Sequence, residues 1–257
     1  MYDTPAFLAA LLVSACANAQ SNPPGSRVVA VGDLHADLDN ARAALQLAGV
    51  TDAEGHWVGG HTTLVQTGDT TDRGPDSKDI LDWLQRLGPE ADAAGGKVIA
   101  LLGNHEVMNL QGDWRYVDPG DISKFGGSEN RKQAFGQDGS YGQWLQTLPV
   151  VAKVGDTVFT HGGIHPTWAA HGIEDLNAEA RQALWTRGAA IHSETGPTWF
   201  RGFAQEPEAT ACPALTTSLA LLSAKRMVVG HSTRRNGKIE TRCGGRLVVI
   251  DTGIADH

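Results

Sequence analysis

The feature that most constrains the fold is a recurring unit, in which a short run rich in β-branched residues stops at a polar turn that contains glycine. The runs cover residues 27–31, 62–67, 97–102, 157–160 and 226–229. Continuous apolar runs of this length are typical of strands that are buried on both faces. The pattern therefore predicts a sheet-based core with polar side chains gathered where the strands end.

Helical patterns lie between several of these runs. Residues 38–48 and 76–87 each place apolar side chains on one helical face, and Pro75 is a helix-opening signal. Strands that alternate with helices indicate an α/β architecture, in which ligands bind beyond the carboxyl ends of the strands. Residues 107–148 lack a strand pattern and are expected to be mainly helical, whereas residues 237–250 are expected to form a hairpin.

The composition excludes several classes of protein. The 257 residues include 21 basic and 29 acidic side chains, a net charge of −8, which argues against a non-specific nucleic-acid binder. With 41% hydrophobic and 19% charged residues the chain is typical of a globular protein, and its length suits one large α/β domain or two small ones. No apolar run reaches the ~18 residues of a membrane span. We expect neither a nucleic-acid partner nor a transmembrane span.

The N-terminus predicts export. Residues 6–15 are apolar and precede Ala17-Asn18-Ala19, a small-x-small cleavage signal. We therefore expect a signal peptide at 1–19, a linker at 20–26 and one domain at 27–257, in a periplasmic protein.

Two observations leave alternatives open at this end of the chain, and the expected export also bears on the two cysteines near the other end. Residues 1–5 contain Asp3 and no basic residue, so the segment is instead an N-terminal helix of a cytoplasmic protein if it is not a signal. Val13-Ser14-Ala15-Cys16 looks like a bacterial lipobox, which would end a lipoprotein signal before Cys16 and attach a lipid anchor there. In an oxidising compartment Cys212 and Cys243 form an even pair, which favours a disulfide over two buried thiols.

The polar residues at the strand ends have the character of metal ligands. Taken singly, each motif is more often an ordinary turn, but five of them in one chain indicate a shared site. Their three oxygen and three imidazole donors suit borderline divalent ions such as manganese, iron, zinc and cobalt. A single carboxylate, Asp69, can bridge two ions held ~3.5–4 Å apart. The candidate ligands are Asp33, His35, Asp69, Asn104, His161 and His231.

The motifs, in this order, resemble those of the calcineurin-like metallophosphoesterases, over roughly residues 27–253. The arginine of the second motif favours the phosphoprotein phosphatase branch, and Trp199-Phe200-Arg201-Gly202 with Asp251-Thr252-Gly253 is most similar to the Shewanella-like protein phosphatases of bacteria and plants. The five motifs are Gly32-Asp33-x-His35, Gly68-Asp69-x-x-Asp72-Arg73-Gly74, Gly103-Asn104-His105-Glu106, His161-Gly162-Gly163 and Gly230-His231.

The resemblance implies a two-sheet β-sandwich flanked by helices, a four-layer α/β/β/α fold. It implies two divalent ions, with manganese expected first. One ion would be held by Asp33, His35 and Asp69, and the other by Asp69 together with Asn104, His161 and His231. The implied activity is hydrolysis of phosphomonoesters, on phosphorylated protein side chains, by direct attack of a metal-bound hydroxide.

The resemblance also assigns roles beside the ions. His105 would protonate the leaving oxygen, with Asp72 orienting its ring. Arg73 and Arg201 would bind the phosphate oxygens, although Arg187 lies in a competing Trp-x-Arg-Gly sequence fourteen residues earlier.

Two rival functions stay open from the sequence. One is a small-molecule phosphatase or dinucleoside-polyphosphate hydrolase on the same scaffold, since an exported enzyme meets few phosphoproteins. The other is a non-catalytic metal-binding module, against which the presence of His105, Asp72 and Arg73 argues. The loops carry no recognised signal that separates phosphotyrosine from phosphoserine or phosphothreonine.

His165 could line the site, and the aromatic residues Trp114, Tyr116 and Trp144 either pack within the helical stretch or shape a groove.

Overall fold

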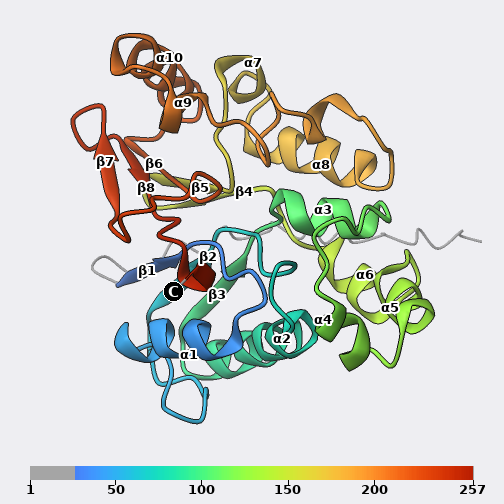
Figure 1. Ribbon diagram of the computed structural model, residues 1–257. Helices are drawn as coiled ribbons and strands as arrows, with labels where there is room; N and C mark the ends of the chain where they lie inside the picture. The colour runs from blue at the N-terminus through green and yellow to red at the C-terminus, as the bar shows by residue number, and fades with distance from the viewer. Residues whose placement is uncertain (1–26, 257) are drawn as a thin grey trace, which may run out of the picture.

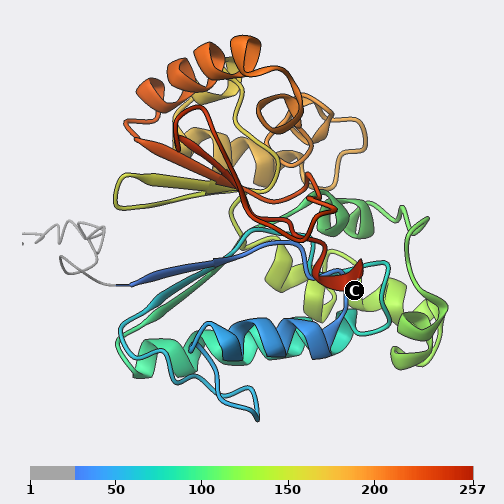
Figure 2. The ribbon, with the colours of Figure 1, turned by 60° about the vertical axis from the view of Figure 1, so that its left-hand side comes forward.

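The computed structural model describes residues 27–256, so the expected signal peptide, the linker and Cys16 lie outside the described residues. In the described part, two sheets stack face to face, with helices covering both outer faces (Figure 2). This arrangement confirms the four-layer α/β/β/α fold. The first sheet is parallel, in the order β1 (Val28–Val31), β2 (Thr63–Gln66), β3 (Lys97–Ala100). The second has the order β4 (Val151–Val154), β5 (Thr157–Thr160), β6 (Arg226–Val229), β8 (Leu247–Val249), β7 (Glu240–Arg242).

Three groups of helices surround the sandwich (Figure 1). The outer side of the first sheet carries α1 (Leu38–Leu47) and α2 (Ser77–Ala93). The outer side of the second carries α7 (Pro166–Ala169), α8 (Ile173–Ala183), α9 (Gly202–Gln205) and α10 (Glu208–Leu221). A third group lies to one side of the sandwich, consisting of α3 (Asn104–Leu110), α4 (Pro119–Lys124), α5 (Ser128–Phe135) and α6 (Ser140–Leu145). The 3-10 turns are η1 (Ala190–His192) and η2 (Ile254–Asp256).

Two elements differ from the sequence expectations. The second helix runs to Ala93 rather than ending at Leu87, because it continues through Pro89. Strand β4 was not expected from its four residues, which alternate too briefly to give a pattern; it forms by pairing antiparallel with β5. Within residues 27–256 no helix has both the length and the apolar character that crossing a bilayer requires.

The sheet register brings the polar turns together. Val31, Gln66 and Ala100 are aligned across the parallel first sheet, so the turns after β1, β2 and β3 leave the same edge. In the second sheet Thr160 is aligned with Val229, so the turns after β5 and β6 also leave one edge. An apolar layer that includes Val65, Leu101, Phe159, Val228 and Ile250 lies between the sheets. The two sets of turns therefore meet at one end of the sandwich.

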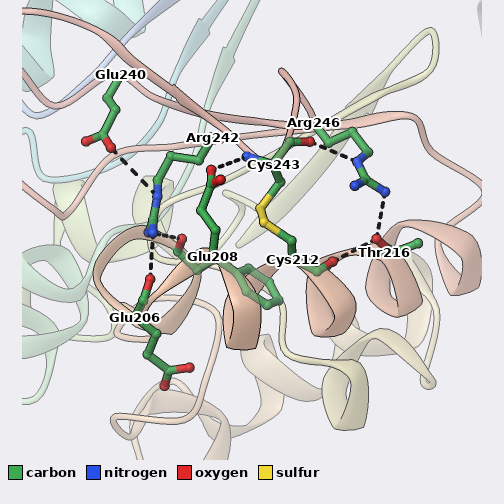
Figure 3. The surroundings of a disulfide bond; sticks show 9 residues. Glu206, Glu208, Cys212, Thr216, Glu240, Arg242, Cys243 and Arg246 are labelled. Carbon is green, nitrogen blue, oxygen red and sulfur yellow. Dashed lines mark hydrogen bonds and ion pairs between the residues drawn. A yellow bond between two sulfur atoms is a disulfide. The ribbon is translucent and has the colours of Figure 1, made fainter.

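A disulfide fastens the C-terminal hairpin to the helices (Figure 3). The expected pairing of Cys212, on α10, with Cys243, between β7 and β8, is present. The Glu208 carboxylate accepts the backbone N–H of Cys243 at 2.6 Å, and Arg246 donates to Thr216 Oγ1 at 2.7 Å. The hairpin predicted over residues 237–250 is thereby held against α10.

Candidate metal centre

Backbone strain is concentrated at the turns that carry the candidate site residues. A left-handed backbone costs an L-residue roughly 1–2 kcal/mol, and such residues gather at functional sites. Five of the predicted site residues have positive φ: His35 (42°), Asp69 (56°), Asp72 (69°), Arg73 (69°) and His231 (62°). The turns also pass very close together, since a Cβ on Gly103 would lie 2.2 Å from Asp69 Oδ1. The local geometry is therefore set by surrounding contacts rather than by residue preference.

One group of donor atoms converges on the Nε2 atom of His161. This nitrogen lies 3.1 Å from Asp69 Oδ2, 3.0 Å from Asn104 Oδ1 and 3.0 Å from His231 Nδ1. Metal–ligand bonds of about 2.1 Å place neighbouring ligands roughly 3–3.5 Å apart. The spacing of these four atoms fits ligands arranged around one ion.

The outer hydrogen bonds decide which ring nitrogens face the centre. His161 Nδ1 lies 2.9 Å from the Thr67 carbonyl oxygen, and His231 Nε2 lies 2.9 Å from the Trp199 carbonyl oxygen. Because a carbonyl only accepts, each of these nitrogens carries the hydrogen of the neutral ring. His161 Nε2 and His231 Nδ1 then both present lone pairs, 3.0 Å apart. Repulsion between two lone pairs at this distance is relieved by a positive charge, which either a proton on His161 or a bound cation can provide.

A second group of donors lies on the other side of Asp69. His35 Nε2 is 3.8 Å from Asp69 Oδ2 and 3.9 Å from Asp33 Oδ2, while His35 Nδ1 lies 3.2 Å from the Thr71 carbonyl oxygen. Because the Thr71 carbonyl only accepts, His35 Nδ1 carries the hydrogen of the neutral ring, and the lone pair on Nε2 faces the two carboxylates. All six predicted ligands are brought together, each no more than 5% exposed. Asp69 belongs to both groups, as a bridging ligand must.

The pKa values of these buried groups show how strongly the two carboxylates attract positive charge. Burial raises the pKa of Asp33 well above its usual range. Burial would lower the pKa of His161, but the charges of Asp69 and Asp33 outweigh it and raise the pKa to about 9. Burial together with the charge of His161 lowers the pKa of His231 to about 2. A proton on His161 thus stands in for the cation that the carboxylates attract.

His105 and Asp72 form a buried pair beside these groups. His105 Nδ1 lies 2.7 Å from Asp72 Oδ2, and His105 Nε2 lies 3.9 Å from Asp69 Oδ2. Burial lowers the pKa of His105, but the charge of Asp69 and the bond to Asp72 more than offset it and raise the pKa above its usual value. The carboxylate of Asp72 therefore holds the Nδ1 edge of the ring, while Nε2 points toward the candidate ligands.

Two arginines lie at the same end of the sandwich. Burial lowers the pKa of His35 to about 4 although the charge of Asp69 opposes it, and the charge of the exposed Arg73 adds to the lowering. Arg201 donates to the backbone carbonyl of His231. Arg187 instead donates to the carbonyl of Gln111, so of the two Trp-x-Arg-Gly arginines Arg201 is the one that contacts a predicted ligand.

Of the histidine and the three aromatic residues for which the sequence left two roles open, three pack against the protein and one lies beside the site. His165 caps α7 and contacts Thr167. Trp144 packs against the core, and Trp114 lies over a buried arginine. Tyr116 is different, because it is 46% exposed and its ring centroid lies 5.1 Å from that of His105. It stands at the open side of the site.

Glu106 supports the site and was given no role in the sequence analysis. Its carboxylate accepts backbone N–H groups from Gly103, Asp69, Thr70 and Thr71 at 2.8–3.1 Å. It joins the turns after β2 and β3 and thereby fixes the backbone of Asp69. The sequence could have indicated this role, because Glu106 lies three residues after Gly103, and a glutamate at that position of a helix start accepts the backbone N–H of the first residue.

Asn109 and Arg131 were also missed. Asn109 follows His105 by four residues on α3, so helical spacing could have placed it on the same face. Its amide donates to Asp72 Oδ1 at 2.8 Å. Arg131 donates to Asn109 Oδ1 at 2.7 Å from α5, and no local pattern indicated this.

Comparisons with known proteins agree with the motifs. The family model described as calcineurin-like phosphoesterase matches residues 26–232. An uncharacterised protein of Schizosaccharomyces pombe is 38% identical over 242 residues, covering 88% of this chain and 73% of the relative. Shewanella-like protein phosphatase 2 of Arabidopsis thaliana is 32% identical, with 89% and 71% covered. The crystal structure of a cold-active protein-tyrosine phosphatase from a psychrophilic Shewanella has a TM-score of 0.77 at 27% identity, covering 91% of this chain and 75% of that one.

Proposed function

Since the chain belongs to the calcineurin-like phosphoesterases and is a phosphoester hydrolase with Shewanella-like protein phosphatases among its relatives, we propose that it is a dinuclear metal-dependent phosphomonoesterase. The observation that carries this proposal is the convergence of three acceptor atoms, Asp69 Oδ2, Asn104 Oδ1 and His231 Nδ1, on His161 Nε2 at 3.0–3.1 Å. A divalent ion satisfies all of them at once.

Two ions fit the donor set. The family uses divalent metals, and the His and Asp groups of this site could hold them. Asp33, His35 and Asp69 would bind one ion; Asp69, Asn104, His161 and His231 would bind the other. When bound, the ions would supply an activated water and neutralise phosphate charge. The mixed oxygen and nitrogen donors accept several borderline divalent ions, and we propose manganese first, with iron, zinc or cobalt as alternatives.

The buried pair would handle the proton of the reaction. With its Nδ1 hydrogen donated to Asp72, His105 presents Nε2 toward the site and can deliver a proton from that atom to the leaving oxygen. Arg73 and Arg201 would bind the phosphate oxygens, since a guanidinium matches two oxygens at once. The backbone N–H of Asp69 donates to Glu106 at 2.8 Å, and this bond would keep Asp69, the ligand shared by both ions, in place during the reaction.

For the substrate we propose phosphorylated protein side chains, and phosphotyrosine ahead of phosphoserine. Two observations support this choice. The exposed ring of Tyr116 lies beside His105, where the leaving group of the substrate would sit, and an aromatic leaving group would pack on it. The structurally similar Shewanella protein is described as a protein-tyrosine phosphatase.

We also propose that the protein is exported and periplasmic. The apolar segment 6–15 and the following cleavage signal support this, and so does the Cys212–Cys243 disulfide, because such bonds persist in oxidising compartments. Fractionation of cells expressing the full chain, beside a version lacking residues 1–19, tests it. Export requires that only the full chain reach the periplasm.

A phosphate panel tests the activity itself. Metal-reconstituted wild type would be assayed on a phosphotyrosine peptide, a phosphoserine peptide, sugar phosphates, nucleotides and a dinucleoside polyphosphate. His105→Ala is expected to keep both metals and lose most turnover. Lost metal would make His105 a ligand, and unchanged turnover would remove it from the chemistry. Faster turnover of nucleotides or sugar phosphates than of peptides would favour the small-molecule alternative.

A matched pair of variants tests the leaving-group surface. Tyr116→Ala is expected to lower kcat/KM for the phosphotyrosine peptide more than for the phosphoserine peptide. Tyr116→Phe keeps the ring and should behave like wild type. An equal loss on both peptides would refute the aromatic contact.

A further inference from the structure

Arg131 is a cation sealed inside the protein at the back of the candidate site. Its side chain is completely buried, on α5, in the group of helices that follows the first sheet in the chain and lies to one side of the sandwich. Nε donates to Asp121 Oδ2 at 2.8 Å, and Nη1 donates to Asn109 Oδ1 at 2.7 Å. Aromatic rings surround the guanidinium and exclude water, with centroids 4.5–5.5 Å from its central carbon; they belong to Trp114, Phe125 and Phe135.

A continuous set of hydrogen bonds joins this cation to His105. A guanidinium only donates, so the Asn109 atom that faces Arg131 is the oxygen. The amide nitrogen of Asn109 must then face the other way, where it donates to Asp72 Oδ1 at 2.8 Å and to the His105 carbonyl at 2.9 Å. Asp72 Oδ2 in turn accepts from His105 Nδ1 at 2.7 Å. Arg131 thus determines the orientation of each group up to the imidazole.

The charge of Arg131 acts on Asp72 directly as well. Nη2 makes no hydrogen bond within the described residues and lies 3.9 Å from Asp72 Oδ1. Both side chains are completely buried, so solvent screens this attraction little. Burying a charged group is costly unless an opposite charge lies beside it. Asp72 therefore has its positive partner behind it and the imidazole in front.

We propose that Arg131 is a positioning residue of the reaction: acting through Asn109 and on Asp72, it keeps the Nδ1 hydrogen of His105 engaged so that Nε2 faces the leaving oxygen. This inference rests on the proposed phosphatase function. It gives the inserted helices a role in the chemistry, because α5 supplies a charge that neither sheet provides. The competing role is a purely structural one, in which Arg131 only ties α5 to α4 through Asp121.

The dependence of rate on leaving group separates the two roles. A p-nitrophenolate leaves readily without being protonated. A phenolate is more basic, so its departure depends more on a proton from the acid, and misplacing the acid slows phenyl phosphate more than p-nitrophenyl phosphate. For Arg131→Met in the metal-reconstituted protein, we expect kcat for phenyl phosphate to fall about tenfold further than kcat for p-nitrophenyl phosphate, with little change in KM. Arg131→Lys keeps a charge and should recover part of the loss.

Asn109→Ala and Asp121→Asn are the matched variants. Asn109→Ala breaks the same connection while leaving the cation in place, so it carries the test if Arg131→Met does not fold; the same selective loss is expected. Asp121→Asn weakens the structural pair without touching Asp72, and should slow both substrates equally or not at all. Equal losses on both substrates in Arg131→Met and Asn109→Ala, or a selective loss in Asp121→Asn, would overturn the positioning role.

His105→Ala distinguishes this failure from failure of the proposed function. If His105→Ala loses phenyl phosphate turnover selectively while Arg131→Met and Asn109→Ala do not, the role of Arg131 alone is wrong. If His105→Ala shows no selective loss, or the reconstituted wild type hydrolyses neither ester, the proposed acid is wrong and the role of Arg131 is overturned with it.

Discussion

Removing the Cys212–Cys243 disulfide is expected to lower the free energy of unfolding by about 3.7 kcal/mol at 25 °C. The bond joins residues 31 positions apart. In the chain-entropy treatment, opening a loop of that length returns conformational freedom to the unfolded chain, and the figure follows from the logarithm of the loop length. For a protein of this size the loss corresponds to a fall of about 7–15 °C in melting temperature.

The folded hairpin should stay docked without the bond. Its contacts with the helices do not depend on sulfur: Cys243 N–H donates to Glu208 at 2.6 Å, Arg246 donates to Thr216 at 2.7 Å, and Arg242 donates to the Phe203 carbonyl at 2.6 Å. The turns that carry the candidate ligands follow β1, β2 and β3 in the first sheet and β5 and β6 in the second, not the hairpin strands β7 and β8. We therefore expect a loss of stability with phosphatase activity at 25 °C unchanged.

Denaturant unfolding checks this, with and without dithiothreitol, on wild type and on the double variant Cys212→Ser/Cys243→Ser. The reductant should shift wild type onto the variant and leave the variant where it is. A loss smaller than about 1 kcal/mol would refute the loop-entropy reasoning. Activity falling in parallel with stability would refute the independence of the hairpin from the site.

Three further predictions concern the metal centre and the fold. Gly103→Ala would place a Cβ 2.2 Å from Asp69 Oδ1, so elemental analysis is expected to find less bound metal, whereas Gly88→Ala, whose Cβ meets nothing within 4 Å, should keep its metal; equal metal content would contradict the crowding argument. Chelation is expected to abolish phosphatase activity and lower the melting temperature, because an ion held by ligands that meet only in the folded protein stabilises the folded state; an unchanged melting temperature would argue against a resident metal. Burial lowers the pKa of His192 below its usual value, so below about pH 6.5 the unfolded chain binds the proton that the folded protein resists. The stability it contributes is present above that pH and is lost as pH falls, by at most about 1.4 kcal/mol per unit, so the difference in denaturant midpoint between pH 7 and about pH 5.5 should be smaller in His192→Asn than in wild type; an equal difference would exclude His192 as a cause.

The strand-end motifs were predictable because their signal is local. A buried strand must be apolar throughout, and the turn that ends it needs glycine, so both leave a mark in a few consecutive residues. Parallel register then places the carboxyl ends together, which is why Asp33, Asp69 and Asn104 could be grouped before any contact was known. The hairpin followed from a similarly local pattern, whereas the disulfide followed from the even cysteine pair and the expected export.

The support behind the site could not be predicted in the same way. Arg131 lies in the sequence Ser-Glu-Asn-Arg-Lys-Gln-Ala-Phe, which is polar enough for a solvated helix. Its burial depends on Asp121 and Asn109, which lie on two other helices and become neighbours only after packing. Strand β4 has the same origin, since its pairing with β5 rather than its own residues makes it a strand.

The backbone N–H of His231 donates to Asp33, 198 positions earlier in the chain, and this separation has a consequence in time. At about 5–20 residues per second, a ribosome needs roughly 10–40 s to pass from one to the other. Throughout that interval the nascent chain has Asp33 but lacks the last imidazole, so ion binding waits for the second sheet to close. If the chain crosses a membrane before it folds, the ion that it acquires is chosen by metal availability at the destination and not by availability where translation began.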